Sequence, residues 1–185
     1  NFEVLEGIAS EAFMPVSYGG GISGRADASQ LFRLGFEKVV LQSLIFSDPS
    51  EVRLMSDDFG AQSIVGALDF CQTGPDDYGL RSGILRTGTH TLRSALLACG
   101  EIGLGEILIT AVDREGTREG LDLRLLEAAR PLVSCPLVLN GGAQSLYDVR
   151  VAVDSGADAV GAGALFTFFG PFRSVMINYP SQEEL

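Results

Sequence analysis

The sequence is short of the residues from which many kinds of site are built. Its three cysteines, Cys71, Cys99 and Cys135, are too few and too scattered for a disulfide framework or a zinc site. His90 is the one histidine in the 185 residues, and its place next to an expected helix start indicates a surface or capping role, so we propose no Ser–His or Cys–His catalytic pair. We interpret the cysteines as packing residues, and we expect no metal.

Positive charge is also scarce. Thirteen Lys and Arg stand against 24 Asp and Glu, a net charge of −11, which argues against a nucleic-acid partner because a phosphate backbone needs clustered cations. A phosphorylated small molecule remains possible, since glycine-turn amides bind phosphate without net positive charge. No apolar run reaches the ~18 residues of a membrane helix, and no signal segment opens the chain. We therefore expect a reduced, cytoplasmic setting without a membrane partner.

What the sequence does contain is a long internal repeat. Placing Pro15 on Pro136, an offset of 121 residues, aligns Gly20-Gly21 with Gly141-Gly142 without a gap. Each copy reads as an apolar strand, a glycine turn, an amphipathic helix and a second apolar strand. A strand that ends in glycines before a helix exposes backbone N–H groups to an anion. The repeat therefore predicts two phosphate sites, one in each copy.

Apolar strands and amphipathic helices alternate along the chain. The expected strands are 14–18, 38–42, 63–68, 106–110, 136–139 and 159–162, and the expected helices include 26–34, 49–59, 91–102, 121–132 and 146–154. This alternation predicts a parallel α/β sheet, either doubly wound or closed into a barrel, and the repeat favours the barrel. We predict one domain over 1–185, an incomplete (β/α)8 TIM barrel holding about six of eight units, strands three to eight.

Four segments resemble the cyclase subunit of imidazole glycerol phosphate synthase, a (β/α)8 barrel of histidine biosynthesis. They contain Gly19-Gly20-Gly21-Ile22, Ala67-Leu68-Asp69, the thirteen-residue block 105–117 and Gly141-Gly142-Ala143. The resemblance implies a heterodimer in which a glutaminase subunit supplies ammonia through the barrel. It implies a bis-phosphorylated ribulosyl aminoimidazole carboxamide substrate, converted to imidazole glycerol phosphate and an aminoimidazole carboxamide ribotide without metal or organic cofactor. The ending, 170–180, resembles instead a branch associated with surface-polysaccharide sugar modification.

Two carboxylates are the candidate catalytic residues. Asp69 and Asp113 each follow an apolar strand, and carboxylates at the C-terminal ends of barrel strands are typical of catalysis. The resemblance implies that Asp69 is the general acid/base and that Asp113 is a second active-site carboxylate. Thr110 is expected to line the pore. The rival interpretations are a helix cap or loop aspartate for Asp69 and a turn-forming aspartate for Asp113.

The two phosphate sites involve neighbouring loops. We expect a first grip of Gly20, Gly21, Gln42 and Ser43, and a second grip of Gly141, Gly142, Gly163 and Ala164. The rival interpretation of the glycines is a turn that needs positive φ, which is compatible with phosphate binding. Relatives commonly have Asn-Thr at the positions of Gln42-Ser43 and a Ser at Ala164, so the second grip lacks a hydroxyl.

Other departures from the family pattern concern catalysis. The family's strand-one carboxylate and the lysine of the loop after it are absent from this sequence, and Phe70-Cys71 replace a basic pair after Asp69. Where the family has lysines in the loop before a Thr-Gly pair, this sequence has a single basic residue, Arg86, before Thr87-Gly88. We therefore expect the chain alone not to complete the reaction. Two alternatives stay open: the related phosphoribosyl isomerase, and a non-catalytic scaffold that binds a glutaminase.

Overall fold

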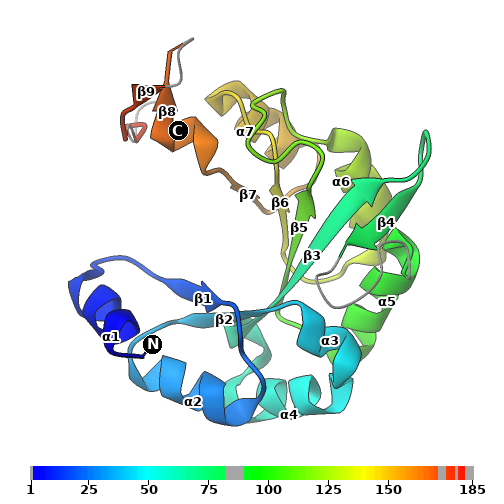
Figure 1. The fold of residues 1–185 in the computed structure, drawn as a ribbon. Coiled ribbons are helices and arrows are strands. Elements are labelled where there is room, and N and C mark those ends of the chain that lie inside the picture. The colour runs from blue at the N-terminus through cyan, green and yellow to red at the C-terminus, as the bar shows by residue number, and fades with distance from the viewer. Residues whose placement is uncertain (1, 82–89, 171–173, 178, 182–185) are drawn as a thin grey trace.

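A curved parallel sheet forms the centre of the molecule (Figure 1), whose computed structural model describes residues 2–81, 90–170, 174–177 and 179–181. Its strands, in spatial order, are β1 (Ser17–Gly19), β2 (Lys38–Leu41), β3 (Ile64–Gln72), β5 (Glu106–Ala111), β6 (Leu137–Asn140) and β7 (Ala159–Gly161). Every neighbouring pair among these six is parallel. Strand β4 (Tyr78–Arg81) adds antiparallel to β3. Within the described residues, the outer edges of β1 and β7 have no partner strand.

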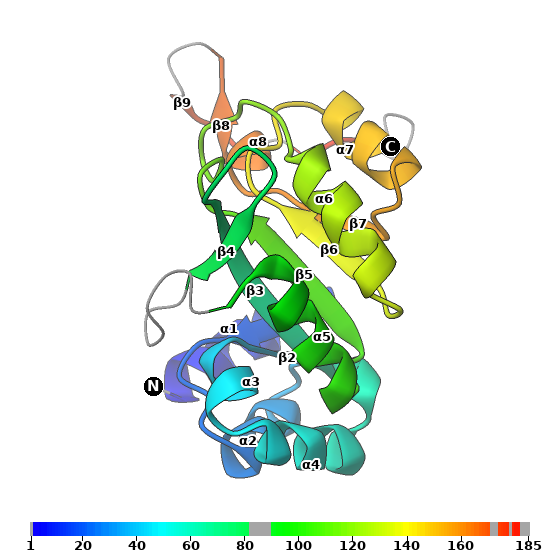
Figure 2. The ribbon, with the colours of Figure 1, turned by 90° about the vertical axis from the view of Figure 1, so that its right-hand side faces the viewer.

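The helices between the strands cover the convex side of the sheet, while α1 (Phe2–Glu11) precedes the first strand and α8 (Ala164–Thr167) follows β7. Those between the strands are α2 (Arg25–Arg33), α3 (Ser43–Ser47), α4 (Pro49–Phe59), α5 (Leu92–Ile102), α6 (Leu123–Ala129) and α7 (Leu146–Asp154), with 3-10 turns η1 (Ala61–Ser63) and η2 (Arg130–Leu132). Figure 2 shows α4, α5 and α6 covering the convex face. A doubly wound sheet carries helices on both faces, so this one-sided curl confirms the predicted partial barrel.

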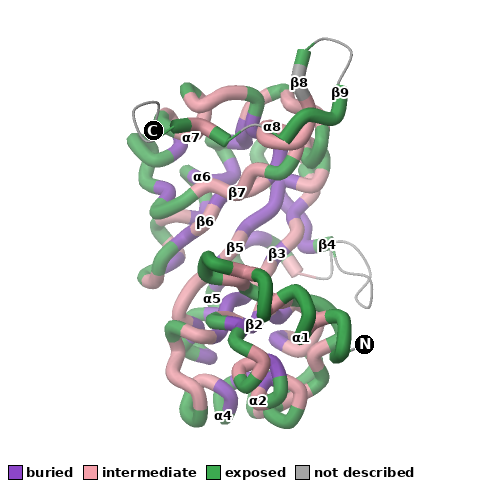
Figure 3. The backbone as a smooth tube through the Cα atoms, turned by 90° about the vertical axis from the view of Figure 1, so that its left-hand side faces the viewer, coloured by how far each residue is buried: buried purple, intermediate pink, exposed green. Residues whose placement is uncertain are grey.

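Alternating side chains divide each strand between two environments. Val39, Ile109 and Leu139 face the helices and are completely buried. Their sequence neighbours, such as Val40 and Leu108, face the concave side and are only half-buried. The buried segments accordingly follow the central strands in Figure 3, whereas α1 has no buried residue. The concave face is thus a partly open, apolar surface with polar groups along one rim.

The internal repeat is confirmed in three dimensions. At the offset of 121, helix α2 falls on α7 residue for residue, and β1 falls within β6. The glycines that follow these two helices, Gly35 and Gly156, have nearly equal φ values of 101° and 105°. Both lie in the left-handed region that favours glycine. The two copies therefore share backbone geometry as well as sequence pattern.

Helix boundaries follow the capping residues. Asp48 caps α4 by accepting a hydrogen bond from the backbone N of Glu51, with Pro49 in the first turn. Thr91 caps α5 in the same way, and Gly103 ends that helix in the left-handed conformation. The expected helix 121–132 is shorter than predicted, because Pro131 lies in a 3-10 turn after Ala129.

The segment after Asp69 differs from a simple loop. Strand β3 continues to Gln72, beyond the expected strand 63–68, and pairs with β4 as an antiparallel hairpin. Arg86, Thr87 and Gly88 lie outside the described residues, as do parts of the ending 170–180. In the described part of the chain, no helix has both the length and the apolar character needed to cross a membrane.

Candidate functional site

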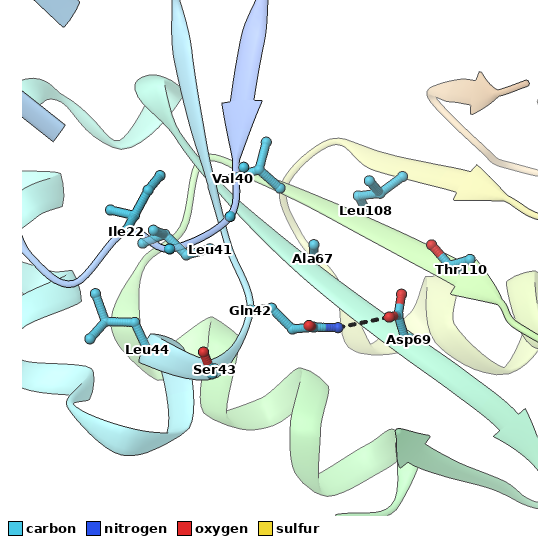
Figure 4. Close-up of a pocket in the computed structure, with 13 residues that line it drawn as sticks. Ile22, Val40, Leu41, Gln42, Ser43, Leu44, Ala67, Asp69, Leu108 and Thr110 are labelled. Atoms are coloured by element: carbon cyan, nitrogen blue, oxygen red, sulfur yellow. Dashed lines mark hydrogen bonds between the residues drawn. The ribbon is translucent and has the colours of Figure 1, made fainter. Parts of the chain in front are cut away.

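A cavity of about 430 Å³ opens at the C-terminal ends of four strands (Figure 4). Gly19, Gly20 and Gly21 form its wall at the end of β1, and Gln42 and Ser43 follow β2. Two polar residues of the central strands complete its rim, Asp69 from β3 and Thr110 from β5. Apolar side chains line the remainder: Ile22, Val40, Leu41, Leu44, Ala67 and Leu108. All members of the first grip therefore meet one candidate catalytic carboxylate in a single cavity.

Within this cavity, Gln42 contacts Asp69 directly. Its side-chain Nε2 donates a hydrogen bond to Asp69 Oδ2 over 2.8 Å, and Figure 4 shows the amide turned toward the carboxylate. Both side chains are half-buried, so solvent competes only partly with this bond. Gln42 thus orients the carboxylate, a function that the sequence did not suggest for it.

The first glycine turn is open toward solvent. Gly20 and Gly21 have φ values of 121° and 70°, and a Cβ added to either would meet no atom within 4 Å. Glycine is required here by backbone conformation and not by crowding. The turn leaves room beside its own backbone, as a site for an anion needs.

A second group of polar side chains continues the rim beyond Thr110. Asn140, the last residue of β6, donates from Nδ2 to Thr110 Oγ1 at 3.3 Å and to Glu115 Oε2 at 3.2 Å. Thr110 pairs in register with Asp69 on one side and with Asn140 on the other. The sequence patterns predicted no site role for Asn140 or Glu115. Asn140 ends a parallel strand, and the same rule that identified Asp69 could have found it.

The second grip surrounds a much smaller cavity, of about 10 Å³. Gly142, Gly163 and Ala164 line it together with Asn140, Glu115 and Arg118. Gly141 lies beside it, but is packed so closely that an added Cβ would approach Ala111 O to 2.5 Å. Gly142 is equally confined by the carbonyl of Gly120. The two glycine turns are therefore alike in φ and different in surroundings.

Asp113 lies apart from both cavities. This exposed residue accepts a hydrogen bond from the backbone N of Gln72 over 2.7 Å, which joins the end of β3 to the loop after β5. It lines neither the first nor the second cavity. Its catalytic role stays a prediction, and its observed contact is with the hairpin.

A buried network fixes the same hairpin from the other side. Tyr78 on β4 donates to Asp122, which also accepts from the backbone N of Leu125 and so caps α6. Burial, with a further contribution from the charge on Asp122, raises the pKa of Tyr78 to about 12. Arg114 lies 3.8 Å from Asp122 and supplies a compensating positive charge. The hairpin is thus a fixed part of the rim.

No group of three or more potential metal-binding side chains gathers in the described residues. Lys38 and Glu106, the first residues of β2 and β5, form an ion pair at the N-terminal ends of the strands, away from the two cavities.

Comparison with known proteins places the chain among biosynthetic enzymes. A protein family described as "Histidine biosynthesis protein" matches residues 1–173. The "Putative imidazole glycerol phosphate synthase subunit hisF2" of Pseudomonas aeruginosa is 37% identical over 190 residues, covering 100% of this chain and 74% of the relative. The imidazole glycerol phosphate synthase subunit HisF of Streptomyces coelicolor is 36% identical over 169 residues, covering 90% of this chain and 67% of the relative.

Proposed function

This chain belongs to the histidine biosynthesis protein family, with HisF subunits of imidazole glycerol phosphate synthase among its relatives, and we propose that it is the cyclase subunit of a glutamine amidotransferase. Ammonia from a partner glutaminase would react with a bis-phosphorylated ribulosyl aminoimidazole carboxamide. The products would be imidazole glycerol phosphate and an aminoimidazole carboxamide ribotide.

One observation carries this proposal: Asp69 shares a single cavity with the whole of the first grip. A substrate phosphate held by the amides of Gly20 and Gly21 would bring its attached carbon skeleton along the apolar wall toward Asp69. Ring closure with ammonia requires proton transfers, and a carboxylate at this position can accept and return a proton. Gln42 would keep that carboxylate pointed at the substrate.

The order of strands supports a substrate with a phosphate at each end. The first grip follows β1 and β2, and the second follows β6 and β7, while Asp69 lies on β3 between them. A molecule that spans the two grips must therefore pass the carboxylate. The polar row of Thr110 and Asn140 lies along the same path and could receive its hydroxyl groups.

Binding and turnover test different parts of the proposal. We expect calorimetric titration of the chain with the bis-phosphorylated substrate to show one binding site, and Asp69→Asn to retain it, because the grips remain. Turnover is then measured with ammonium salts and with a glutaminase. We expect no cyclised product from the chain alone, since only one of the two general acid/base carboxylates implied by the resemblance is present.

The alternative outcomes are distinct. Product from the chain alone would contradict the expected inactivity while supporting the cyclase. Amadori isomerisation of the substrate precursor would indicate the isomerase, and stimulation of a glutaminase without substrate binding would indicate a scaffold. A wild-type chain that binds no bis-phosphate would overturn the proposed function.

A further inference from the structure

The second cavity contains a positive charge that the proposed phosphate grip does not yet use. Arg118, in the loop between β5 and α6, lines this cavity with Gly142, Gly163 and Ala164. We propose that Arg118 is a phosphate-binding residue of the second grip, where its guanidinium holds the phosphomonoester dianion of the substrate. This inference rests on the proposed function and adds to it a specificity-determining residue.

The guanidinium of Arg118 has donors to spare. Its Nη1 donates to the backbone O of Phe168 over 3.2 Å, which holds the side chain across the segment that follows β7. Its Nε is buried and has no hydrogen-bond partner in the structure. A buried N–H of a charged group without a partner is costly, and a native structure rarely leaves one so without a reason. A rotation of the side chain toward the mouth of the cavity would let a phosphate oxygen accept from this N–H.

The backbone of Arg118 is strained as well. Its φ of 59° is the one positive value among the non-glycine residues that the structure describes. A side chain in the left-handed region is unfavourable, and such residues gather at binding and active sites where the surroundings hold them. A glycine would adopt this conformation freely, as Gly116 and Gly120 do on either side, with φ values of 73° and 96°. The loop keeps an arginine at a position that suits glycine.

The charges around the second cavity favour a role for Arg118 in binding an anion. Glu115 lines the same cavity, and the chain as a whole has a net charge of −11. Among the residues that line the cavity, Arg118 supplies the one positive charge. Without it, a phosphate dianion would meet the Glu115 carboxylate with only uncharged donors in its favour. Ala164 contributes a methyl group and no side-chain donor to this cavity.

The size of the cavity determines how the phosphate would bind. At about 10 Å³ it has room for little more than one water molecule, so the phosphate would rest on its mouth, beside the exposed Gly163. A planar guanidinium can reach such a ligand from the side and donate two parallel hydrogen bonds. The same contact with Phe168 O would then link ligand binding to the position of the α8 segment.

Arg118→Gly separates binding from stability. The variant removes the cation, and glycine adopts the positive φ without strain, so we expect an unchanged or higher thermal midpoint. We expect phosphate binding at the second grip to be about tenfold weaker or more. The probe is inorganic phosphate, titrated at constant ionic strength and followed by the ¹⁵N shifts of the Gly141, Gly142 and Gly163 amides. The Gly20 and Gly21 amides report the first grip in the same spectra and should titrate as in the wild type.

Two matched variants complete the test. Arg118→Lys keeps the positive charge but loses the planar guanidinium with its paired donors, and should give intermediate phosphate affinity. Arg150→Gln removes an exposed cation of α7 outside the cavity and should not change phosphate affinity at the second grip. Unchanged affinity at the second grip in Arg118→Gly, or an equal loss in Arg150→Gln, would overturn the role of Arg118 and leave the proposed function standing. A wild type whose glycines do not respond to phosphate would instead remove the grips themselves, and with them both proposals.

Discussion

Gln42 Nε2 donates a hydrogen bond to Asp69 Oδ2 over 2.8 Å, joining the end of β2 to the candidate catalytic carboxylate on β3. The contact makes Gln42 a positioning residue for Asp69 as well as a neighbour of the first glycine turn.

A double-mutant cycle measures that contact. We expect Gln42→Leu to cost about 1 kcal/mol of unfolding free energy, because the half-buried carboxylate loses a donor. In the Asp69→Leu background the same change should cost much less. The coupling energy from urea denaturation of the four proteins should therefore be about 1 kcal/mol, and additivity within 0.3 kcal/mol (roughly the limit for independent sites) would contradict the contact.

The two glycine turns offer a matched comparison. Gly20→Ala and Gly141→Ala both force alanine to a positive φ, 121° and 103°, but only the second places a Cβ 2.5 Å from a carbonyl oxygen. We expect a cost of about 1–2 kcal/mol for the first and about 3 kcal/mol or more for the second. Urea denaturation of both variants checks the order. Equal costs would mean that the end of β5, where Ala111 lies, yields freely to the added methyl group.

Asp113 can be tested for its structural contact. Asp113→Ala removes the acceptor of the Gln72 amide, so we expect a loss of about 1 kcal/mol and faster hydrogen exchange at Gln72. Binding of phosphate at the first grip should not change, since Asp113 does not line that cavity. A variant with full stability and unchanged exchange at Gln72 would contradict the structural contact.

The Tyr78 hydroxyl should make stability depend on alkaline pH. Its pKa is raised from 10.0 to about 12, so the folded state holds the proton more tightly than the unfolded state between these values. Stability from this group is therefore complete below pH 10 and falls as the pH rises toward 12. We expect Tyr78→Phe to cost about 1 kcal/mol at pH 8, and the difference from wild type to shrink by pH 11.

Denaturation at both pH values checks the sign. The control is Tyr147→Phe, because Tyr147 is exposed on α7 and should give no comparable dependence. A gap between wild type and Tyr78→Phe that widens with pH would contradict the buried hydrogen bond to Asp122.

The sequence predicted the strands and most helices because their apolar spacing and caps act locally. The helix that begins at Pro49 illustrates this, since Asp48, Pro49 and Glu51 define its start within four residues. Helix α3 was missed because five residues between a strand and another helix leave too short a pattern. The extension of β3 to Gln72 was missed because it depends on pairing with β4, a tertiary contact.

The candidate site was predicted unevenly for the same reason. Strand ends are visible in a sequence, so Asp69 and both glycine turns could be proposed, and the structure gathers Asp69 and the first grip in one cavity. The direction of a loop side chain is not visible. Asp113 and Glu115 are two residues apart in one motif, yet the first contacts the hairpin and the second lines the cavity of the second grip. Arg118 gave no signal at all, because its φ and burial exist only in the folded chain.

Because of the repeat at an offset of 121 residues, the same structural unit occurs twice in the chain, in two different surroundings. Helix for helix and turn for turn, the copies begin from the same backbone, yet Gly20 faces open space and Gly141 is wedged against a neighbouring carbonyl. Duplicated positions that differ in confinement should differ in how freely they change over generations. The first copy can accept new side chains at little structural cost, whereas the second is held to its present form by the end of β5 and the loop that follows it.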